Sequence, residues 1–231
     1  MPERAWIHYG RYLNERLNGK PTQYITHRQE FFGREFYVNK DVLIPRPETE
    51  HLVEGALAWL KQWPGAVVLD VGTGSGAIAI SVALEARLPV LASDISTAAL
   101  EVARRNSRTL RAPVALFAGD LLTAVRPATV DLLLSNPPYV PGADAANMQR
   151  EVRDWEPHVA LFAGNTGLEI YQRIITGAAA VLKPHGCLMM ELGFQSLESV
   201  RDMLQEGGWT EIRATSDLAG WPRVIQASRS T

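Results

Sequence analysis

The stretch LLLSNPPYV, residues 132–140, joins an apolar run to the tetrapeptide Asn136-Pro137-Pro138-Tyr139. Proline cannot continue a central strand, so a buried strand is expected to end here. The side-chain oxygen of Asn136 and a proline carbonyl are two fixed acceptors, which suit the two hydrogens of a planar NH₂ group. Such bonds would direct the nitrogen lone pair at an electrophile, and Tyr139 would cover the group or stabilise positive charge on it. Taken alone, the same residues also fit an ordinary turn.

A second motif, DVGTGSG, follows another apolar run and precedes a helical pattern. Its glycines let the backbone turn tightly and approach a ligand closely. The dinucleotide fingerprint would require a glycine at position 77, and a phosphate-binding loop would require a Lys-Ser or Lys-Thr pair; neither is present. The segment therefore favours a ligand with an adenosine and an amino-acid tail. The predicted binding residues are Asp70, Gly72, Thr73, Gly74, Ser75 and Gly76.

Two aspartates close the next two predicted strands, Asp94 in ASDIS and Asp120 in AGDLL. An acid about 20 residues after a glycine loop reaches ribose hydroxyls, which suits Asp94. Its alternative role is the N-cap of a helix beginning near Ser96. Asp120 is placed to accept from an adenine amino group, although it also fits a turn. The neighbouring residues Ile95 and Leu121 complete the predicted nucleoside site.

The elements that position these motifs follow from the residue pattern. Residues 1–19 are expected to form an amphipathic helix and residues 50–63 another helix. Between them, residues 23–38 are rich in Tyr, Ile, Phe and Val around Gly33, and FFGREFYV, residues 31–38, is expected to form a β-hairpin. Beyond them, short apolar strands alternate with helices, which predicts right-handed crossovers and a mostly parallel sheet with helices on both faces. The last two strands are joined by the short loop DLAGWP and are expected to pair antiparallel.

Composition limits the classes of function. The chain has 231 residues, a net charge of −2 and a pI of about 6.2. This balance argues against a protein that grips long nucleic acids through phosphate contacts, so no stable nucleic-acid partner is expected. The N-terminus has no apolar signal core, and no apolar run approaches the roughly 20 residues of a membrane helix. The sequence therefore predicts a cytoplasmic protein without a membrane partner.

Cysteine and histidine residues suggest neither a disulfide framework nor a metal site. The lone cysteine, Cys187, stands in a hydrophobic run and is interpreted as a small core residue. Three histidines near predicted loops, His27, His51 and His158, are interpreted as surface residues. No spacing of Cys and His predicts a metal centre.

Together, these motifs resemble the S-adenosylmethionine-dependent methyltransferases, in particular those that methylate exocyclic or amide nitrogens. Within that group the chain is similar to the release factor glutamine methyltransferase family over about residues 11–229. The conjunction of PRPETE, residues 45–50, with NPPY is highly specific. Further positions that fit the family pattern are Pro21–Ile25, Phe32-Gly33, Phe36, Val38, Val42–Glu50, Glu156-Pro157, Ala160-Leu161, Asp217–Gly220 and Arg223.

The resemblance implies a Rossmann-like α/β fold. Its seven-stranded, mostly parallel sheet would have an antiparallel last strand and helices on both faces, preceded by a β-hairpin linker and a short N-terminal helix. Residues 1–20 would be the remnant of an N-terminal helical substrate-docking domain, residues 21–48 the hairpin linker and PRPETE loop, and residues 49–231 the methyltransferase domain. Relatives often place an aromatic residue over adenine where this chain has Leu121, which predicts a weaker stacking contact.

The resemblance also implies an activity: methyl transfer from S-adenosylmethionine to the glutamine side chain in the Gly-Gly-Gln motif of a class I peptide chain release factor. Residues 136–139 would then be catalytic and substrate-binding, and Asn136 would also contact the cofactor. Arg46 and Glu48 of PRPETE would shape the substrate pocket, or would simply pair with each other. The protein is expected to be a monomer.

Three alternatives stay open at this stage. A glutamine methyltransferase acting on a ribosomal protein carries a different segment after V-L-x-P-R, and residues 47–50, PETE, favour a release factor instead. An amino-methyltransferase acting on adenine, cytosine or guanine would use the same NPPY chemistry, but the acidic pI and the lack of a basic extension count against it. A non-catalytic binding module would not need complete NPPY and glycine motifs.

Overall fold

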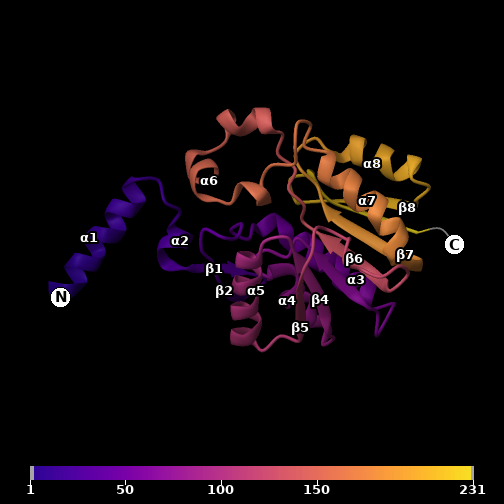
Figure 1. Ribbon diagram of the computed structural model, residues 1–231, viewed down its shortest axis with the longest axis horizontal. Coiled ribbons are helices and arrows are strands. Elements are labelled where there is room, and N and C mark those ends of the chain that lie inside the picture. The colour runs from indigo at the N-terminus through magenta and orange to yellow at the C-terminus, as the bar shows by residue number, and fades with distance from the viewer. Residues whose placement is uncertain (1–2, 230–231) are drawn as a thin grey trace.

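Seven strands form the central sheet, in the order β5-β4-β3-β6-β7-β9-β8 (Figure 1). The computed structural model of the protein describes residues 3–229. The strands are β3 (Val68–Val71), β4 (Val90–Asp94), β5 (Val114–Ala118), β6 (Val130–Ser135), β7 (Leu182–Glu191), β8 (Thr210–Ser216) and β9 (Pro222–Ser228). All neighbouring pairs from β5 to β7 are parallel, which confirms the predicted α/β class.

The strand order reverses between β3 and β6. The strands β4 and β5 lie on one side of β3, whereas β6 and β7 lie on the other. In sheets of this kind a ligand crevice forms outside the carboxyl ends of the strands at such a switch point. Because Asp70 of β3 is in register with Leu134 of β6, the glycine loop and the NPPY segment leave the sheet next to each other.

The last strand, β9, runs antiparallel to its neighbours, as predicted, but it lies inside the sheet between β7 and β8. Its residues Val224, Ile225 and Ala227 are buried, whereas β8 exposes most of its side chains and includes Glu211 and Arg213. The interior position removes more of the apolar surface of β9 from water than an edge position would. The charged side chains of β8 protect the edge of the sheet from pairing with other chains.

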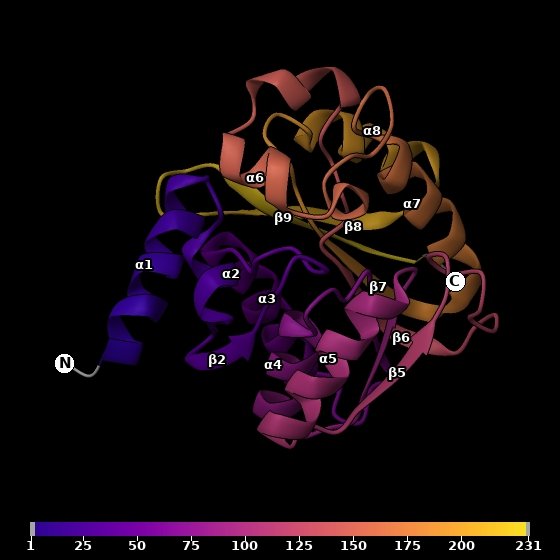
Figure 2. The ribbon, with the colours of Figure 1, turned by 60° about the vertical axis from the view of Figure 1, so that its left-hand side comes forward.

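Helices cover both faces of the sheet, as predicted (Figures 1 and 2). They are α3 (Glu50–Leu60), α4 (Ala77–Ala86) and α5 (Thr97–Leu110) on one face, and α7 (Glu169–Val181) and α8 (Leu197–Glu206) on the other. Successive strand residues point to opposite faces, so Val68 packs in the core under α3 and α4, and Leu69 in the core under α7 and α8. The predicted core residue Cys187 is buried in the first of these cores.

The segment before the sheet is partly a helix and not entirely a hairpin. Helix α2 (Thr22–Thr26) precedes the hairpin of β1 (Arg28–Phe31) and β2 (Arg34–Tyr37), which confirms the hairpin around Gly33, whereas the start of the segment from residue 23 is helical. The reason is tertiary: Tyr24 is buried, and its hydroxyl donates to the carbonyl of Val42 at 2.6 Å. The hairpin turn has positive φ at both Phe32 (49°) and Gly33 (68°), as a two-residue turn of this type requires.

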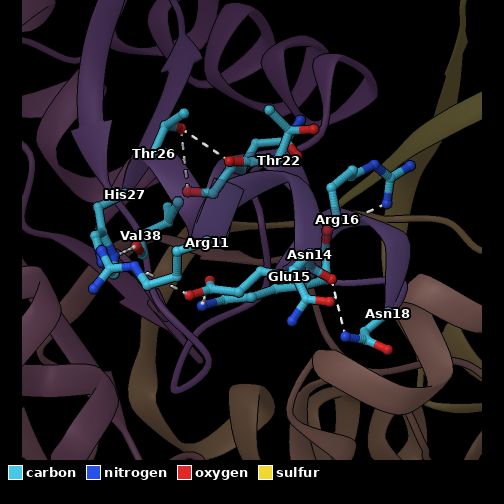
Figure 3. A network of polar contacts seen from close by, with 11 residues as sticks. Arg11, Asn14, Glu15, Arg16, Asn18, Thr22, Thr26, His27 and Val38 are labelled. Atoms are coloured by element: carbon cyan, nitrogen blue, oxygen red, sulfur yellow. Dashed lines mark hydrogen bonds and ion pairs between the residues drawn. The ribbon is translucent and has the colours of Figure 1, made fainter. Parts of the chain in front are cut away.

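Helix α1 (Glu3–Leu17) extends away from the sheet (Figure 1). Its predicted apolar face, including Trp6 and Leu17, is exposed rather than packed on the protein. Polar contacts join its C-terminal end to the body, among them ion pairs of Lys20 with Glu15 (2.6 Å) and of Arg16 with Glu151 (2.8 Å). Figure 3 shows the polar residues at this junction. Every helix of the described residues is too short or too polar to span a bilayer.

Candidate active site

A cavity of about 250 Å³ lies at the carboxyl ends of the parallel strands. Its walls come from the glycine loop, the ends of β4 and β5, the NPPY segment, the loop before α3 and the segment before α7. Of the predicted site residues, those that line it are Arg46, Gly72, Thr73, Gly74, Ser75, Asp94, Ile95, Asp120, Leu121, Asn136 and Pro138. The predicted residues outside this lining are Glu48, Asp70, Gly76, Pro137 and Tyr139.

Three glycines of the loop after β3 have positive φ, and they serve two purposes. A Cβ atom placed on Gly72 or Gly74 would meet no other atom within 4 Å, so these two positions leave open space beside the cavity. On Gly76, which precedes α4, the same atom would lie 2.9 Å from Cδ1 of Ile80. Gly72 and Gly74 therefore keep room for a ligand, whereas Gly76 allows close packing of the helix.

Asp70 supports the glycine loop from beneath. The residue is fully buried, and its Oδ2 accepts from the Thr73 hydroxyl (2.6 Å) and from the Ala79 N–H (3.2 Å). Burial raises the pKa of this carboxyl to about 7, although both hydrogen bonds act against the shift. The predicted cofactor residue Asp70 thus acts on the loop rather than at the surface of the cavity.

Asp94 holds the loop from the side of β4. Its Oδ2 accepts from the Gly74 N–H and its Oδ1 from the Ser96 N–H, both at 2.9 Å. Burial raises the pKa of the carboxyl, and the backbone hydrogen bonds lower it. The alternative role as a helix N-cap was wrong, because Ser96 caps α5 by accepting from the Ala99 N–H at 3.2 Å.

The far end of the cavity contains a charged pair. Asp120 accepts from the Arg173 guanidinium at 2.7 Å, and both residues line the cavity. Arg173 lies on α7, 53 residues along the chain, so no local pattern indicated it. Leu121 follows Asp120 with a φ of 49°, a left-handed conformation that is unusual for leucine.

The NPPY segment presents its residues in different directions. The Asn136 amide nitrogen donates to the Thr49 hydroxyl oxygen at 3.1 Å, which leaves Oδ1 of Asn136 as an acceptor. Pro137 is buried and Pro138 lines the cavity. The Tyr139 ring packs over Gly193, where a Cβ would lie 2.7 Å from Cδ2 of the ring, and burial raises the pKa of this tyrosine to about 12.

Arg46 of the PRPETE loop pairs with Glu156 and not with Glu48, so the alternative of a local pair was wrong. The other oxygen of Glu156 accepts from the Ile44 N–H at 3.1 Å. Burial raises the pKa of Glu156, while Arg46 lowers it. This carboxylate ties the loop before α3 to the segment that follows α6 (Arg150–Trp155).

Sequence reasoning missed a buried carboxyl at the end of β7. Glu191 is 3% exposed, and its Oε2 has no hydrogen-bond partner among the described residues. Burial raises the pKa of Glu191 to about 7, and hydrogen bonding from Thr49 and Asn136 lowers it. A signal was present, because Glu191 is the only charged residue in the otherwise apolar run CLMMELG.

The interpretation of three histidines as surface residues is confirmed for two of them. His27 and His158 are exposed, and His51 is half-buried beside Glu54, with its Nδ1 3.1 Å from a carboxylate oxygen. None of the three lines the cavity. The polar side chains of the cavity are therefore carboxylates, the Asn136 amide, serine and threonine hydroxyls such as that of Thr49, and the guanidinium groups of Arg46 and Arg173.

Comparison with known proteins identifies the family. The family model of the methyltransferase small domain matches residues 54–153. A release factor glutamine methyltransferase of Koribacter versatilis is 43% identical over 225 residues, which is 96% of this chain and 80% of that protein. A protein of the same name from Bordetella pertussis is 45% identical over 212 residues, or 90% and 78% of the two chains.

Solved structures agree with the fold. A methyltransferase from Pyrococcus furiosus has a TM-score of 0.63 and 19% identity, with 87% of this chain and 91% of that one covered. A 16S rRNA N2 G1207 methyltransferase of T. thermophilus, solved with AdoMet and guanosine, has a TM-score of 0.62 at 18% identity and covers 87% and 49%. Because the two curated relatives match 90% or more of the chain at 43% and 45% identity, the chain belongs to the release factor glutamine methyltransferase family, among the S-adenosylmethionine-dependent methyltransferases.

Proposed function

We propose that the protein transfers a methyl group from S-adenosylmethionine to the side-chain amide nitrogen (N5) of the glutamine in the Gly-Gly-Gln motif of a class I peptide chain release factor. The observation that carries the proposal is the orientation of Asn136. Its Nδ2 donates to Thr49 Oγ1, so Oδ1 is the atom available to accept at the cavity. The names of relatives at 39–45% identity support the choice of substrate.

The residues at the cavity fit the cofactor. Gly72 and Gly74 leave space for a ligand against the backbone, and Asp94 lies beside them with lone pairs for ribose hydroxyls. Asp120 and Leu121 line the same cavity and are proposed to hold the adenine. When bound, S-adenosylmethionine supplies a methyl group on a sulfonium, whose S–C bond breaks as the new N–C bond forms.

The glutamine amide needs help from the protein because its nitrogen lone pair is delocalised into the carbonyl. Oδ1 of Asn136 and the backbone carbonyl of Pro137 would accept both hydrogens of this nitrogen and hold it in line with the methyl group. The same two acceptors stabilise the positive charge that develops on the nitrogen. Its surplus proton then passes to water, so the proposal requires no dedicated base.

Two parts of the chain are proposed to bind the protein substrate. Arg46, on the loop before α3, lines the cavity, and Glu48 lies on the same loop within electrostatic reach of Glu191. Helix α1 presents exposed aromatic side chains, including Trp6 and Tyr9, and is proposed to retain a docking role. Release factors act on the ribosome, which places the proposed reaction in the cytoplasm.

The central test is the variant Asn136→Ala. Because it removes one of the two acceptors but leaves the glycine loop intact, turnover should fall by about 100-fold or more, with cofactor affinity within about threefold. Mass spectrometry of a whole release factor, after incubation with enzyme and S-adenosylmethionine, measures the transfer. The matched control is Asn165→Ala, because Asn165 is exposed and outside the cavity lining.

The outcomes separate the candidate substrates. Methylation of the Gly-Gly-Gln glutamine by the wild type, lost in Asn136→Ala, supports the proposal. Transfer to a ribosomal protein or to a nucleic-acid base, with none to the release factor, would replace the proposed substrate. Retained turnover in Asn136→Ala would remove Asn136 from the mechanism.

A further inference from the structure

A buried carboxyl group, that of Glu191, interacts with the amide of Asn136. The strands β6 and β7 are parallel neighbours, and their register pairs Ser135 with Met190. Asn136 directly follows β6 and Glu191 is the last residue of β7, so the two side chains start from adjacent positions at the same edge of the sheet. Thr49 approaches both from the η1 turn (Pro47–Thr49), and it is itself buried.

The hydrogen bond between Asn136 and Thr49 has a direction. Asn136 Nδ2 donates to Thr49 Oγ1, so the Thr49 hydroxyl is an acceptor in that bond and keeps its own hydrogen to donate. The carboxylate of Glu191 can only accept. Hydrogen bonding from Thr49 and Asn136 stabilises the charged form of Glu191. The hydrogen of Thr49 can therefore be donated to Glu191, which would give a chain of donors from Asn136 through Thr49 to Glu191.

An asparagine amide needs such a partner because its oxygen and its NH₂ group are nearly equal in size. Only hydrogen bonding distinguishes the two orientations. We propose that Glu191 is a positioning residue, whose ionised carboxylate, through Thr49, turns the NH₂ group of Asn136 inward and keeps Oδ1 facing the cavity. This inference rests on the proposed function, because an acceptor at Oδ1 matters when the substrate atom is an NH₂ nitrogen.

Protonation of Glu191 would reverse the direction in which hydrogen bonds are donated among Glu191, Thr49 and Asn136. A protonated carboxyl donates to Thr49, and Thr49 then donates to the Asn136 oxygen, so the amide turns its NH₂ group toward the cavity. A donor would then face the NH₂ group of the substrate. The activity is therefore expected to increase with pH as Glu191 loses its proton.

The surroundings of Glu191 determine where this change takes place. Burial is the main cause of the raised pKa of about 7. Among charged groups, Glu48 of the η1 turn raises this pKa and Arg223 of β9 lowers it. Tyr139 after β6 and Tyr171 on α7 also face the carboxylate, and their own pKa values are raised in part by it.

The test compares two substitutions of Glu191 across pH 5.5 to 9, with methyl transfer to a whole release factor as the assay. Wild-type kcat should rise through about pH 7 and then level off. Glu191→Leu, which has no acceptor, should lower kcat at pH 8 by about 10-fold or more. Glu191→Gln keeps a carbonyl acceptor, so it should retain part of kcat but lose the rise near pH 7.

Thr49 provides a second pair of variants in case Glu191→Leu does not fold. Thr49→Val removes the hydroxyl at nearly constant shape and should lower kcat like Glu191→Leu, whereas Thr49→Ser should restore it. The KM for the release factor and the affinity for S-adenosylmethionine should stay within about threefold of the wild type in all these variants. The matched control is Glu206→Gln, an exposed carboxyl at the end of α8, which should behave as the wild type.

A spectroscopic measurement tests the inference without turnover. The side-chain amide resonances of Asn136, in the free protein, should shift with a midpoint near pH 7 in the wild type and should not shift there in Glu191→Gln. If the release factor is methylated but neither the pH profile nor these resonances depend on Glu191, the inference is overturned and the proposed function stands. If the release factor is not methylated, the proposed function fails. If the Asn136 resonances still shift near pH 7 in Glu191→Gln, the link between Asn136 and Glu191 is overturned as well.

Discussion

At the residue scale, the Asp94 carboxylate combines two tasks. One oxygen accepts from the Gly74 N–H and the other from the Ser96 N–H, which ties the glycine loop to the end of β4. Each carboxylate oxygen has a further lone pair, so two acceptor positions stay available for ribose hydroxyls. One side chain thus shapes the loop and also presents acceptors to the cavity.

Replacing this side chain should weaken cofactor binding. Asp94→Ala removes both backbone contacts and both free acceptors, so affinity for S-adenosylhomocysteine should fall about 10- to 100-fold, as measured by titration calorimetry. Asp94→Asn keeps one acceptor oxygen and should be intermediate. Asp202→Ala, at an exposed position on α8, is the control and should bind as the wild type. Unchanged affinity in Asp94→Ala would contradict the assigned role.

The buried carboxyls Asp70 and Glu191 link stability to pH. Their pKa values are raised from 3.8 and 4.5 to about 7, so between those limits the folded protein binds more protons than the unfolded chain. Stability contributed by these groups is therefore fully present below about pH 4 and is lost as the pH rises through about 7.

Glu191→Gln should remove part of this pH dependence. At pH 8 the variant avoids a buried charge, so its free energy of unfolding should exceed that of the wild type by on the order of 2 kcal/mol. The difference should shrink toward pH 5, where the wild-type carboxyl is protonated. Urea denaturation at several pH values measures this, with Glu206→Gln as the control. A constant difference across the range would exclude titration of Glu191 as its cause. If Glu191→Gln is more stable than the wild type but its activity no longer depends on pH, Glu191 trades stability for activity.

At the scale of elements, Glu156 joins the two covering segments of the cavity. It pairs with Arg46 and accepts from the backbone of Ile44, although more than 100 residues separate it from both. The carboxylate side of this pair is buried, whereas the Arg46 side chain is about one third exposed. Because both segments line the cavity, the pair sets the distance between opposing walls.

Removing Glu156 should loosen both walls. Glu156→Ala leaves Arg46 and the Ile44 N–H without their acceptor, so the free energy of unfolding should fall by about 1 to 3 kcal/mol, and cofactor affinity should fall with it. Denaturant unfolding and calorimetry measure the two effects. Glu151→Ala is the comparison. Because the ion pair of Glu151 with Arg16 is exposed, this substitution should change the free energy of unfolding by no more than about 0.5 kcal/mol. Equal effects of the two substitutions would argue against a special role for Glu156.

At the scale of the whole molecule, the sheet brings residues from distant parts of the chain to one edge. The glycine loop after β3 and the NPPY segment after β6 meet because the strand order reverses between them. The loop before α3 and the segment before α7 cover the resulting cavity. A ligand in this cavity contacts both halves of the sheet, so its binding should stabilise the entire fold.

Ligand binding should therefore raise the melting temperature. S-adenosylhomocysteine at 100 times its Kd should add about 2.7 kcal/mol, which corresponds to roughly 5 to 10 °C for a protein of this size. NAD⁺ at the same concentration should have no effect, because the glycine loop lacks the glycine of the dinucleotide fingerprint at position 77. Differential scanning calorimetry provides the measurement. A shift with NAD⁺ alone would reverse the choice of ligand class.

The amino-acid sequence by itself determined the order of strands and helices and the positions of the motifs at the strand ends. Apolar periodicity, proline and glycine act over a few residues, so the end of β6 at NPPY and the turn after β3 follow from local chemistry. The positions of Asp94 at the end of β4 and of Asp120 just beyond β5 were predicted on the same grounds. The family can also be recognised from the sequence, because its motifs can be read along the chain. The proposed substrate follows from that family.

The tertiary structure alone decided which partners these motifs have. Glu191 and Thr49 reach Asn136 from distant parts of the chain, and neither belongs to the NPPY motif. Arg173 meets Asp120 only because α7 packs on the sheet. The interior place of β9 and the helical form of residues 22–26 likewise depend on burial against other elements. Such contacts depend on how segments that are distant in the sequence pack against one another, and a local sequence pattern does not indicate this packing.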